Sequence, residues 1–170
     1  MPSSACSTDG EALTLYARGM AITNYSQDQL AAQPIGYWSG AANEIIVGSL
    51  RAALAEEDLT QPHWWTLNHV AGAPGKWTRA ALTAKLSPFD TQETDFEAVY
   101  DDLAGRGWTT EANDRLTLTE AGEAGRQRAA GRNLKVHEQM HDGIDTAEYV
   151  AALNVLRRMI ANLGGNSDLP

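Results

Sequence analysis

The chain has 170 residues, of which 43% are hydrophobic, and a formal net charge of -9. This length supports one packed core, or a compact domain with an association arm. The acidic balance argues against indiscriminate binding to nucleic acid or anionic membranes, because both require a surplus of Lys and Arg. Specific DNA binding through a few local contacts stays open.

Cys6 is the single cysteine, so an intrachain disulfide is excluded and a reducing compartment is expected. No apolar run approaches the roughly 20 residues that span a bilayer. Residues 1–20 also lack a charged start followed by an apolar block. We therefore expect a cytoplasmic protein with no membrane partner.

The first part of the chain predicts an arm and a long helix. Residues 1–25 are rich in Ser, Thr and Gly and show only a weak apolar pattern, which is typical of a tail or a loosely packed arm. From Ser26 to about Glu57, apolar and small residues recur at steps of three and four, which predicts one long helix.

Three shorter helices are predicted next. Thr60 is a plausible N-cap for a second helix over residues 60–71, which a Gly-Ala-Pro-Gly run ends. Thr78 caps a third helix over residues 78–86, and a Ser-Pro pair stops it. The fourth helix is expected over residues 90–107, with a narrow apolar stripe on one side.

A hairpin and two further helices complete the pattern. Residues 108–111 and 115–119 are rich in β-forming residues, and a short turn joins them. A fifth helix is predicted over residues 120–140, and a last helix begins near Asp145.

The last helix carries an apolar seam. Its members step by four, three, four and three, the spacing of helices that wrap against one another. They are Tyr149, Leu153, Leu156, Ile160 and Leu163. Such a seam can also pack inside its own chain. Because the outer helices hold more apolar surface than the central module can cover, we favour a homodimer built from the first and last helices.

Three helices followed by a two-stranded wing form a winged helix-turn-helix, a mainly α fold with a small β-hairpin wing (α+β). The expected segments follow the chain. They are an arm or tail (1–25), an amino-terminal dimerisation helix (26–57), the winged helix-turn-helix (58–122), carboxy-terminal dimerisation helices (123–163) and a flexible tail (164–170).

Three motifs resemble the MarR family of transcriptional regulators. LTQPHWWTLNHVA at 59–71 looks like the helix after the dimerisation arm, DDLAGRGWTTE at 101–111 like the segment leading into the wing, and NDRLTLTEAG at 113–122 like the wing and the following helix start. The resemblance implies a homodimer whose recognition helices enter successive major grooves of a near-palindromic operator, while the wings reach the flanking backbone.

The residues expected to contact DNA lie in a module of unusual charge. Residues 58–122 contain ten acids and five basic residues, a poor balance for a phosphate-binding surface. Gln92 can pair two-pronged with adenine. In the resemblance, Arg115 at the wing tip reaches the minor groove or its phosphates, and Asp114 orients it through a charge-assisted bond. The DNA-binding candidates are Arg79, Thr91, Gln92, Thr94, Asp114 and Arg115.

Aromatic residues predict an effector pocket. The resemblance places a cleft between the dimerisation arm and the DNA-binding module, and aromatic walls with polar tips suit a small aromatic or phenolic effector. Binding would shift the population of states and release DNA, as in a repressor. The alternative is that the paired tryptophans are core residues. The candidates are Tyr37, Trp38, Trp64, Trp65, Asn68 and His69.

Other chemistry is weakly indicated. His137 and His141 are four residues apart, a spacing that can serve a metal but is common on solvated surfaces, so we expect none. No nucleophile-and-base grouping, phosphate-cradling glycine loop or cofactor motif stands out. The main alternative to a DNA-binding regulator is a MarR-like fold that has lost DNA binding and serves as a small-molecule binder or enzyme. A weaker one is a protein-interaction module that uses the acidic helix.

Overall fold

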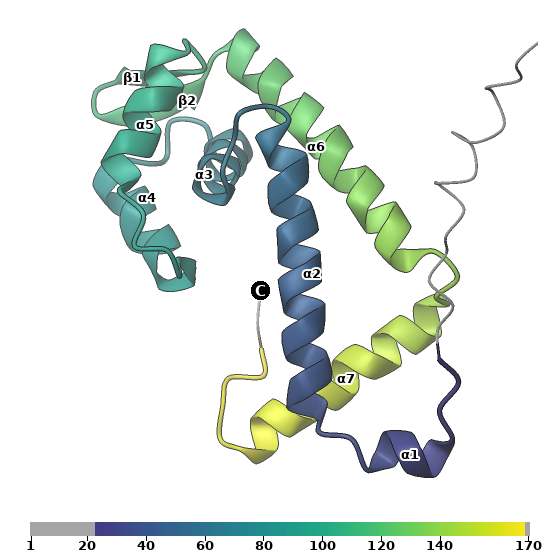
Figure 1. Ribbon diagram of the computed structural model, residues 1–170. Helices are drawn as coiled ribbons and strands as arrows, with labels where there is room; N and C mark the ends of the chain where they lie inside the picture. Colours follow the sequence, from purple (N-terminus) through teal and green to yellow (C-terminus); the bar gives the residue numbers. More distant parts are fainter. Residues whose placement is uncertain (1–22, 169–170) are drawn as a thin grey trace, which may run out of the picture. The chain divides into compact units, whose positions relative to one another are not determined.

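The structure is a computed structural model, and it describes residues 23–168 (Figure 1). Predictions for residues 1–22, including the tail and Cys6, lie outside the described residues. The chain divides into two compact units, residues 1–40 and 41–170. None of the helices within residues 23–168 is long and apolar enough to cross a membrane.

The predicted long first helix is interrupted. Two helices, α1 (Gln27–Ala31) and α2 (Ile35–Ala55), replace the single helix expected over 26–57. Ser26 caps α1 in a reciprocal box, in which its hydroxyl accepts from the Gln29 backbone N–H at 3.2 Å and its own N–H donates to the Gln29 side chain at 2.8 Å. The break falls at Pro34, because a proline disfavours helical backbone in the residue before it.

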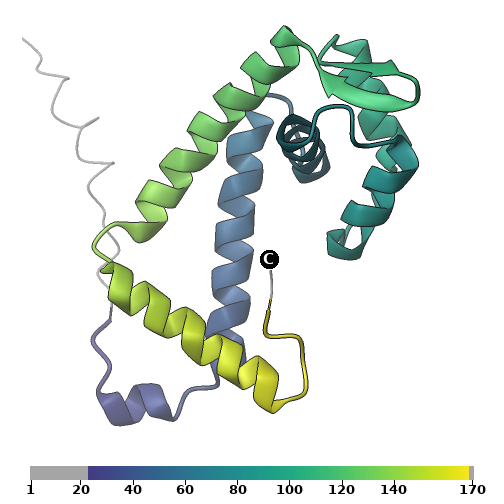
Figure 2. The same ribbon diagram turned by 180° about the vertical axis from the view of Figure 1, so that it is seen from behind.

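The winged helix-turn-helix is confirmed in the second unit. It consists of α3 (Gln61–Gly72), α4 (Arg79–Leu86), α5 (Phe96–Gly105) and an antiparallel hairpin of β1 (Thr109–Ala112) and β2 (Arg115–Leu118). Asn113 and Asp114 form the hairpin turn, with φ of 50° and 59°, the left-handed pair that a two-residue turn needs. Figure 2 shows the hairpin beside the first turn of α6 (Glu120–His141).

Two buried clusters hold this module together, and α5 contributes to both. Val99 and Leu103 pack with residues of α2, α3 and α6, whereas Phe96 and Tyr100 pack with residues of α3, α4 and β2. This alternation makes α5 the shared wall of the core. It leaves only the opposite side of α5 facing outward.

Trp108 joins the hairpin to α6. The Thr119 N–H donates to the Trp108 carbonyl at 3.0 Å, and the Thr119 hydroxyl caps α6 at Gly122. A Cβ at Gly122 would collide with the Trp108 carbonyl, and one at Gly125 would collide with the Trp108 ring. Both glycines are therefore required by close packing rather than by flexibility.

The last helix, α7 (Thr146–Asn162), starts where the sequence predicts. Asp145 and Glu148 form a capping box. No residue of α7 is buried, and of its predicted seam Leu156 and Ile160 are partly covered within residues 23–168, whereas Tyr149, Leu153 and Leu163 are exposed.

The fourth predicted helix starts later than expected. A 3-10 turn, η1 (Ser87–Phe89), is followed by residues 90–95 in a non-helical loop, and α5 begins only at Phe96 with Asp95 as N-cap. The cause is local, since an aspartate side chain that binds nearby backbone N–H groups competes with helix formation. Asp90 accepts from the Thr94 N–H at 2.6 Å and the Gln92 N–H at 3.2 Å.

Candidate DNA-binding face and ligand cleft

The outward side of α5 is acidic. Glu97, Ala98, Asp101 and Asp102 are exposed, opposite the four buried residues of this helix. No basic residue lies within α5. If α5 enters a major groove, it therefore brings three carboxylates towards a polyanion.

Arg79, predicted to contact phosphate, is surrounded by carboxylates. Its guanidinium donates to Asp101 at 2.7 Å, to Glu97 at 3.0 Å and to Glu111 at 3.1 Å. The bonds to Asp101 and Glu97 are the main reasons that the pKa of Arg79 is raised. The cation at the start of α4 thus has three partners within its own module.

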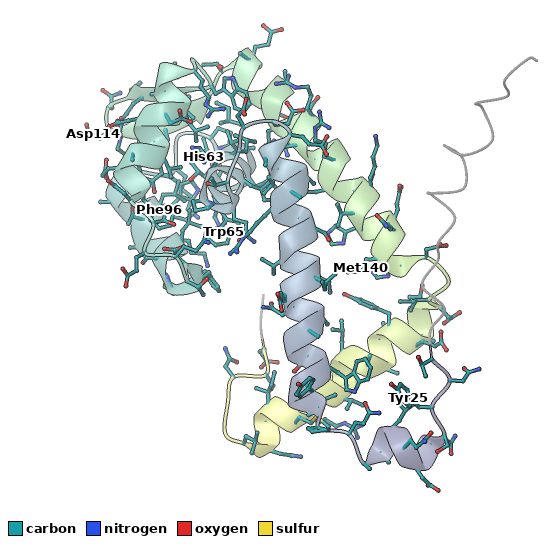
Figure 3. All side chains as sticks on the ribbon, in the orientation of Figure 1. Tyr25, His63, Trp65, Phe96, Asp114 and Met140 are labelled. Carbon is teal, nitrogen blue, oxygen red and sulfur yellow. The ribbon has the colours of Figure 1, made fainter. Side chains whose placement is uncertain are left out.

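The wing tip is formed as predicted, but its two residues are not paired. Asp114 is an exposed turn residue at the tip of the hairpin (Figure 3). The Arg115 guanidinium donates to the Lys76 carbonyl, and among residues 23–168 it makes no bond to the Asp114 carboxylate. Arg115 keeps its charge exposed, so phosphate contact is sterically open.

Thr91, Gln92 and Thr94 do not lie on the recognition helix, and their predicted place there is wrong. The Thr94 hydroxyl donates to Asp90 at 3.0 Å. Thr91 and Gln92 line a cleft that faces α2 and α3 instead. The early helix start expected from the sequence is therefore wrong, whereas contact of these three side chains with DNA stays a prediction.

The cleft has a volume of about 570 Å³. One wall comes from α2, a second from the first turns of α3, and the third from the segment Phe89–Gln92. The Arg51 Nε donates to the Gln61 side chain at 2.8 Å, and its Nη groups make no other hydrogen bond within residues 23–168. The lining residues are Asn43, Glu44, Val47, Gly48, Arg51, Gln61, Pro62, Trp65, Phe89, Asp90, Thr91 and Gln92.

A second cleft of about 340 Å³ adjoins the first. Trp65 and Phe89 line both, and His69, Lys85 and Leu86 complete the second. The first cleft is polar along α2, whereas the second is mostly apolar. The two clefts lie on either side of the rings of Trp65 and Phe89, and the first also holds the charged side chains of Glu44, Arg51 and Asp90.

No protein-family model matches the chain, and no curated protein matches it. Solved structures do match. The PcaV transcriptional regulator from Streptomyces coelicolor is 16% identical, with a TM-score of 0.64, over 79% of this chain and 100% of that chain. A MarR family transcriptional regulator from Silicibacter pomeroyi is 16% identical, with a TM-score of 0.62, over 82% of this chain and 99% of that chain. The chain has the MarR fold.

A third structure with the MarR fold is a DNA complex. The MarR family protein Rv2887 from Mycobacterium tuberculosis, solved with DNA, is 22% identical, with a TM-score of 0.57, over 78% of this chain and 99% of that chain. The same protein has been solved with p-aminosalicylic acid. At these identities the likeness establishes the fold of the present chain, including the mainly α class with a hairpin wing.

The structure separates the predicted ligand residues of this MarR fold. Trp65 and His69 line the clefts, whereas Trp64 packs against the core. Asn68 donates to the Trp64 carbonyl at 2.8 Å and accepts from Arg126 at 3.2 Å. Tyr37 and Trp38 belong to the first unit, where the Trp38 indole donates to Gln33 at 2.7 Å and Tyr37 is 82% exposed.

Sequence reasoning missed Arg51 and Phe89. Arg51 is the single basic residue of α2, and a lone arginine in a long apolar helix was a usable signal. Phe89 lies in a Ser-Pro-Phe turn and is half exposed. No signal in the sequence indicates that its ring lines a cleft, because this depends on how the turn packs in the fold.

His63 connects α3 to α5 of the MarR fold. Its Nδ1 accepts from the Thr60 N–H at 3.3 Å and lies 2.7 Å from the Thr60 hydroxyl, so the ring proton belongs on Nε2, which lies 3.1 Å from the Asp102 carboxylate. Burial lowers the pKa of His63, although Asp102 opposes this. The neutral ring is therefore the form that suits the N-cap of α3.

The histidine pair of α6 packs against aromatic rings. His137 and His141 lie with ring centroids 6.5 Å apart, and His141 packs edge-on against Tyr149 at 4.5 Å. Within residues 23–168 no group of three or more metal-ligating side chains is brought together.

Proposed function

We propose that the protein is a ligand-responsive, dimeric DNA-binding regulator in which the cleft beside Trp65 takes a small aromatic effector. One observation carries this proposal. The segment Phe89–Gln92 forms a wall of the cleft and leads, within four residues, into α5. A ligand-binding wall and a helix aimed at DNA are thus parts of one continuous stretch of chain.

The dimer is supported by the uncovered surface of α7. Of its seam residues, Tyr149 is 37% exposed, Leu153 is 42% exposed and Leu163 is 88% exposed. A helix with a heptad-like seam and no buried residue gains its stability by packing against another helix. A second copy of the chain supplies that surface, and two copies place two α5 helices on one near-palindromic operator.

The effector proposal rests on the chemistry of the cleft. Trp65 and Phe89 offer aromatic faces, and Arg51 offers unpaired guanidinium N–H groups for a carboxylate or phenolate oxygen. We expect the effector to lower DNA affinity, which makes the protein a repressor, and we expect it to act in the cytoplasm.

A second function is favoured by the charge of α5. Glu97, Asp101 and Asp102 face outward, and Arg79 is already held by carboxylates. Both features suit a MarR fold that has lost DNA binding and kept its ligand cleft.

Fluorescence anisotropy with DNA flanking the protein's own gene separates the two functions. The titration is made at about 50 mM and about 200 mM salt, because phosphate contacts made by a few basic residues weaken steeply as the salt concentration rises. We expect Arg115→Ala to weaken binding to all sequences. Lys135→Ala, which removes one exposed charge from α6, is the matched control. Absence of specific binding at both salt concentrations would leave the second function.

A further inference from the structure

We propose that Thr91 and Gln92 are effector-contacting residues and that Asp90 transmits effector binding to the start of α5. This inference rests on the proposed ligand cleft and deepens it. It gives the polar residues ahead of α5 a sensing role rather than a role in reading bases.

Asp90 closes residues 90–94 into a small loop. Its carboxylate accepts from the Gln92 N–H, the Thr94 N–H and the Thr94 hydroxyl, at 3.2, 2.6 and 3.0 Å. Thr91 and Gln92 project from this loop into the cleft. Any ligand that moves Gln92 therefore strains bonds that also hold Thr94.

No residue separates this loop from the cap of α5. Asp95 follows Thr94 directly, and its carboxylate accepts from the Ala98 N–H at 3.2 Å to start the helix. A shift of Thr94 thus reaches the first turn of α5 through one peptide unit.

The loop is also held in a disfavoured backbone conformation. Glu93 has a φ of 53°, the left-handed region that residues with a Cβ rarely adopt. A segment under such constraint has a lower-energy backbone available when its side-chain bonds are released. The Asp90 bonds therefore select one of two arrangements, and a ligand with different affinity for the two shifts their populations.

The ligand that fits this wall is an aromatic anion with a neighbouring hydrogen-bonding group. Arg51 takes the negative charge, Trp65 and Phe89 take the ring, and the Gln92 amide both donates and accepts. Contact with Gln92 should favour aromatic anions that carry a hydrogen-bonding group beside the negative charge over aromatic anions that carry none.

Calorimetric titration tests the contact. The probes are 4-aminosalicylate, which carries a hydroxyl beside its carboxylate, and 2-naphthoate, which carries none. Gln92→Ala should weaken 4-aminosalicylate binding by about five-fold, the value of one lost hydrogen bond, and should change 2-naphthoate binding much less. Gln127→Ala, which makes the same substitution at an exposed site of α6 outside the cleft lining, is the control and should behave as the unmodified chain. Equal affinities in Gln92→Ala and Gln127→Ala would overturn the contact.

Hydrogen exchange of the full chain tests the coupling without DNA. In the unmodified chain, saturating 4-aminosalicylate should change the exchange rates of the amides in residues 94–100. Asp90→Ala should still bind the probe but lose this change, and Asp90→Asn, which keeps one acceptor oxygen, should retain part of it. An unchanged response in Asp90→Ala would overturn the coupling.

The two failures are distinguishable. If neither probe binds the unmodified chain, the proposed cleft is overturned together with the inference. If a probe binds and the Asp90 or Gln92 variants respond as the control does, only the inference is overturned. Far-UV circular dichroism confirms that each variant is folded before it is scored.

Discussion

The Arg79 guanidinium lies 2.7 Å from the Asp101 carboxylate, so a cation of α4 and an acid of α5 neutralise each other on the face that we propose to lie against DNA. Glu97 and Glu111 bind the same guanidinium. A phosphate that approaches must compete with these carboxylates. Binding therefore releases fewer counterions than the count of basic residues suggests.

Removing the two acids of α5 that hold Arg79 should raise DNA affinity. We expect the double variant Glu97→Gln, Asp101→Asn to bind operator DNA about ten-fold more tightly at low salt, since two repulsive charges are lost and Arg79 keeps Glu111 as its one charged partner of the three. Anisotropy titration measures this. Glu138→Gln, Asp142→Asn makes the same charge change near the end of α6 and should have little effect. An unchanged affinity in the first variant would mean that α5 does not face DNA.

Protonation of His63 should destabilise the fold. The pKa of His63 is lowered in the folded state, mainly by burial. The neutral side chain therefore contributes fully to the unfolding free energy above the unfolded pKa of about 6.5, and this contribution is lost as the pH falls towards the folded pKa. Each unit of lowering costs up to about 1.4 kcal/mol. Urea unfolding at about pH 7.5 and about pH 5.5 spans this window.

His63→Gln is the control for that measurement. Glutamine at the same place in the first turn keeps a capping acceptor but does not titrate. The unfolding free energy of His63→Gln should change less than that of the unmodified chain over the same pH interval. If the unfolding free energy of both proteins changes equally between the two pH values, His63 does not cause the change.

The carboxylates that pair with arginines titrate below this interval. Arg126 holds the pKa of Glu123 near 2, and Arg128 and Arg132 lower the pKa of Glu57.

Two glycines of α6 should respond oppositely to alanine. Gly122→Ala places a methyl group against the Trp108 carbonyl, which is held by the Thr119 N–H. It should cost about 2–3 kcal/mol of unfolding free energy. Gly131→Ala meets open space and should stabilise the helix by about 0.5–1 kcal/mol. Thermal unfolding of the two variants compares them directly, and a stable Gly122→Ala variant would contradict the close approach.

Adjacent glutamates at the end of α2 should differ in their effect on stability. Glu57, whose side chain is 10% exposed, binds both Arg128 and Arg132 of α6, whereas Glu56 is 61% exposed and binds Arg132 alone. Glu57→Ala should cost about 1.5–3 kcal/mol because it removes charge-assisted bonds at a half-buried site. Glu56→Ala should cost less than about 1 kcal/mol. Chemical denaturation measures both, and equal losses would show that burial does not distinguish them.

The order of helices and the hairpin could be predicted because their signals are local. Thr60, Thr78 and Thr119 are caps that the sequence places correctly. The start of α5 could not be predicted in the same way. The helical periodicity of α5 made an earlier helix start plausible for residues 90–94. The Asp90 hydrogen bonds that replace helical bonds there form only in the folded loop.

The ligand residues were predicted only in part because clefts are tertiary features. Trp65 and His69 were found from aromatic content, but Trp64 faces the core one residue away. Helical spacing turns adjacent residues by about 100°, and here it directs Trp65 to the clefts and Trp64 to the core. Which of them lines a cleft depends on where α4 packs.

The packing of Trp108 against Gly122 and Gly125 joins the hairpin and the first turns of α6 into one rigid unit. There is no hinge between them, because the indole fills the space in which one would bend. A helix of 22 residues is about 33 Å long, so a tilt of about 5° around its distant end displaces the wing by about 3 Å. A small change in tilt at the junction of α6 and α7 therefore produces a larger displacement of Asn113 and Asp114. The wing itself does not need to bend.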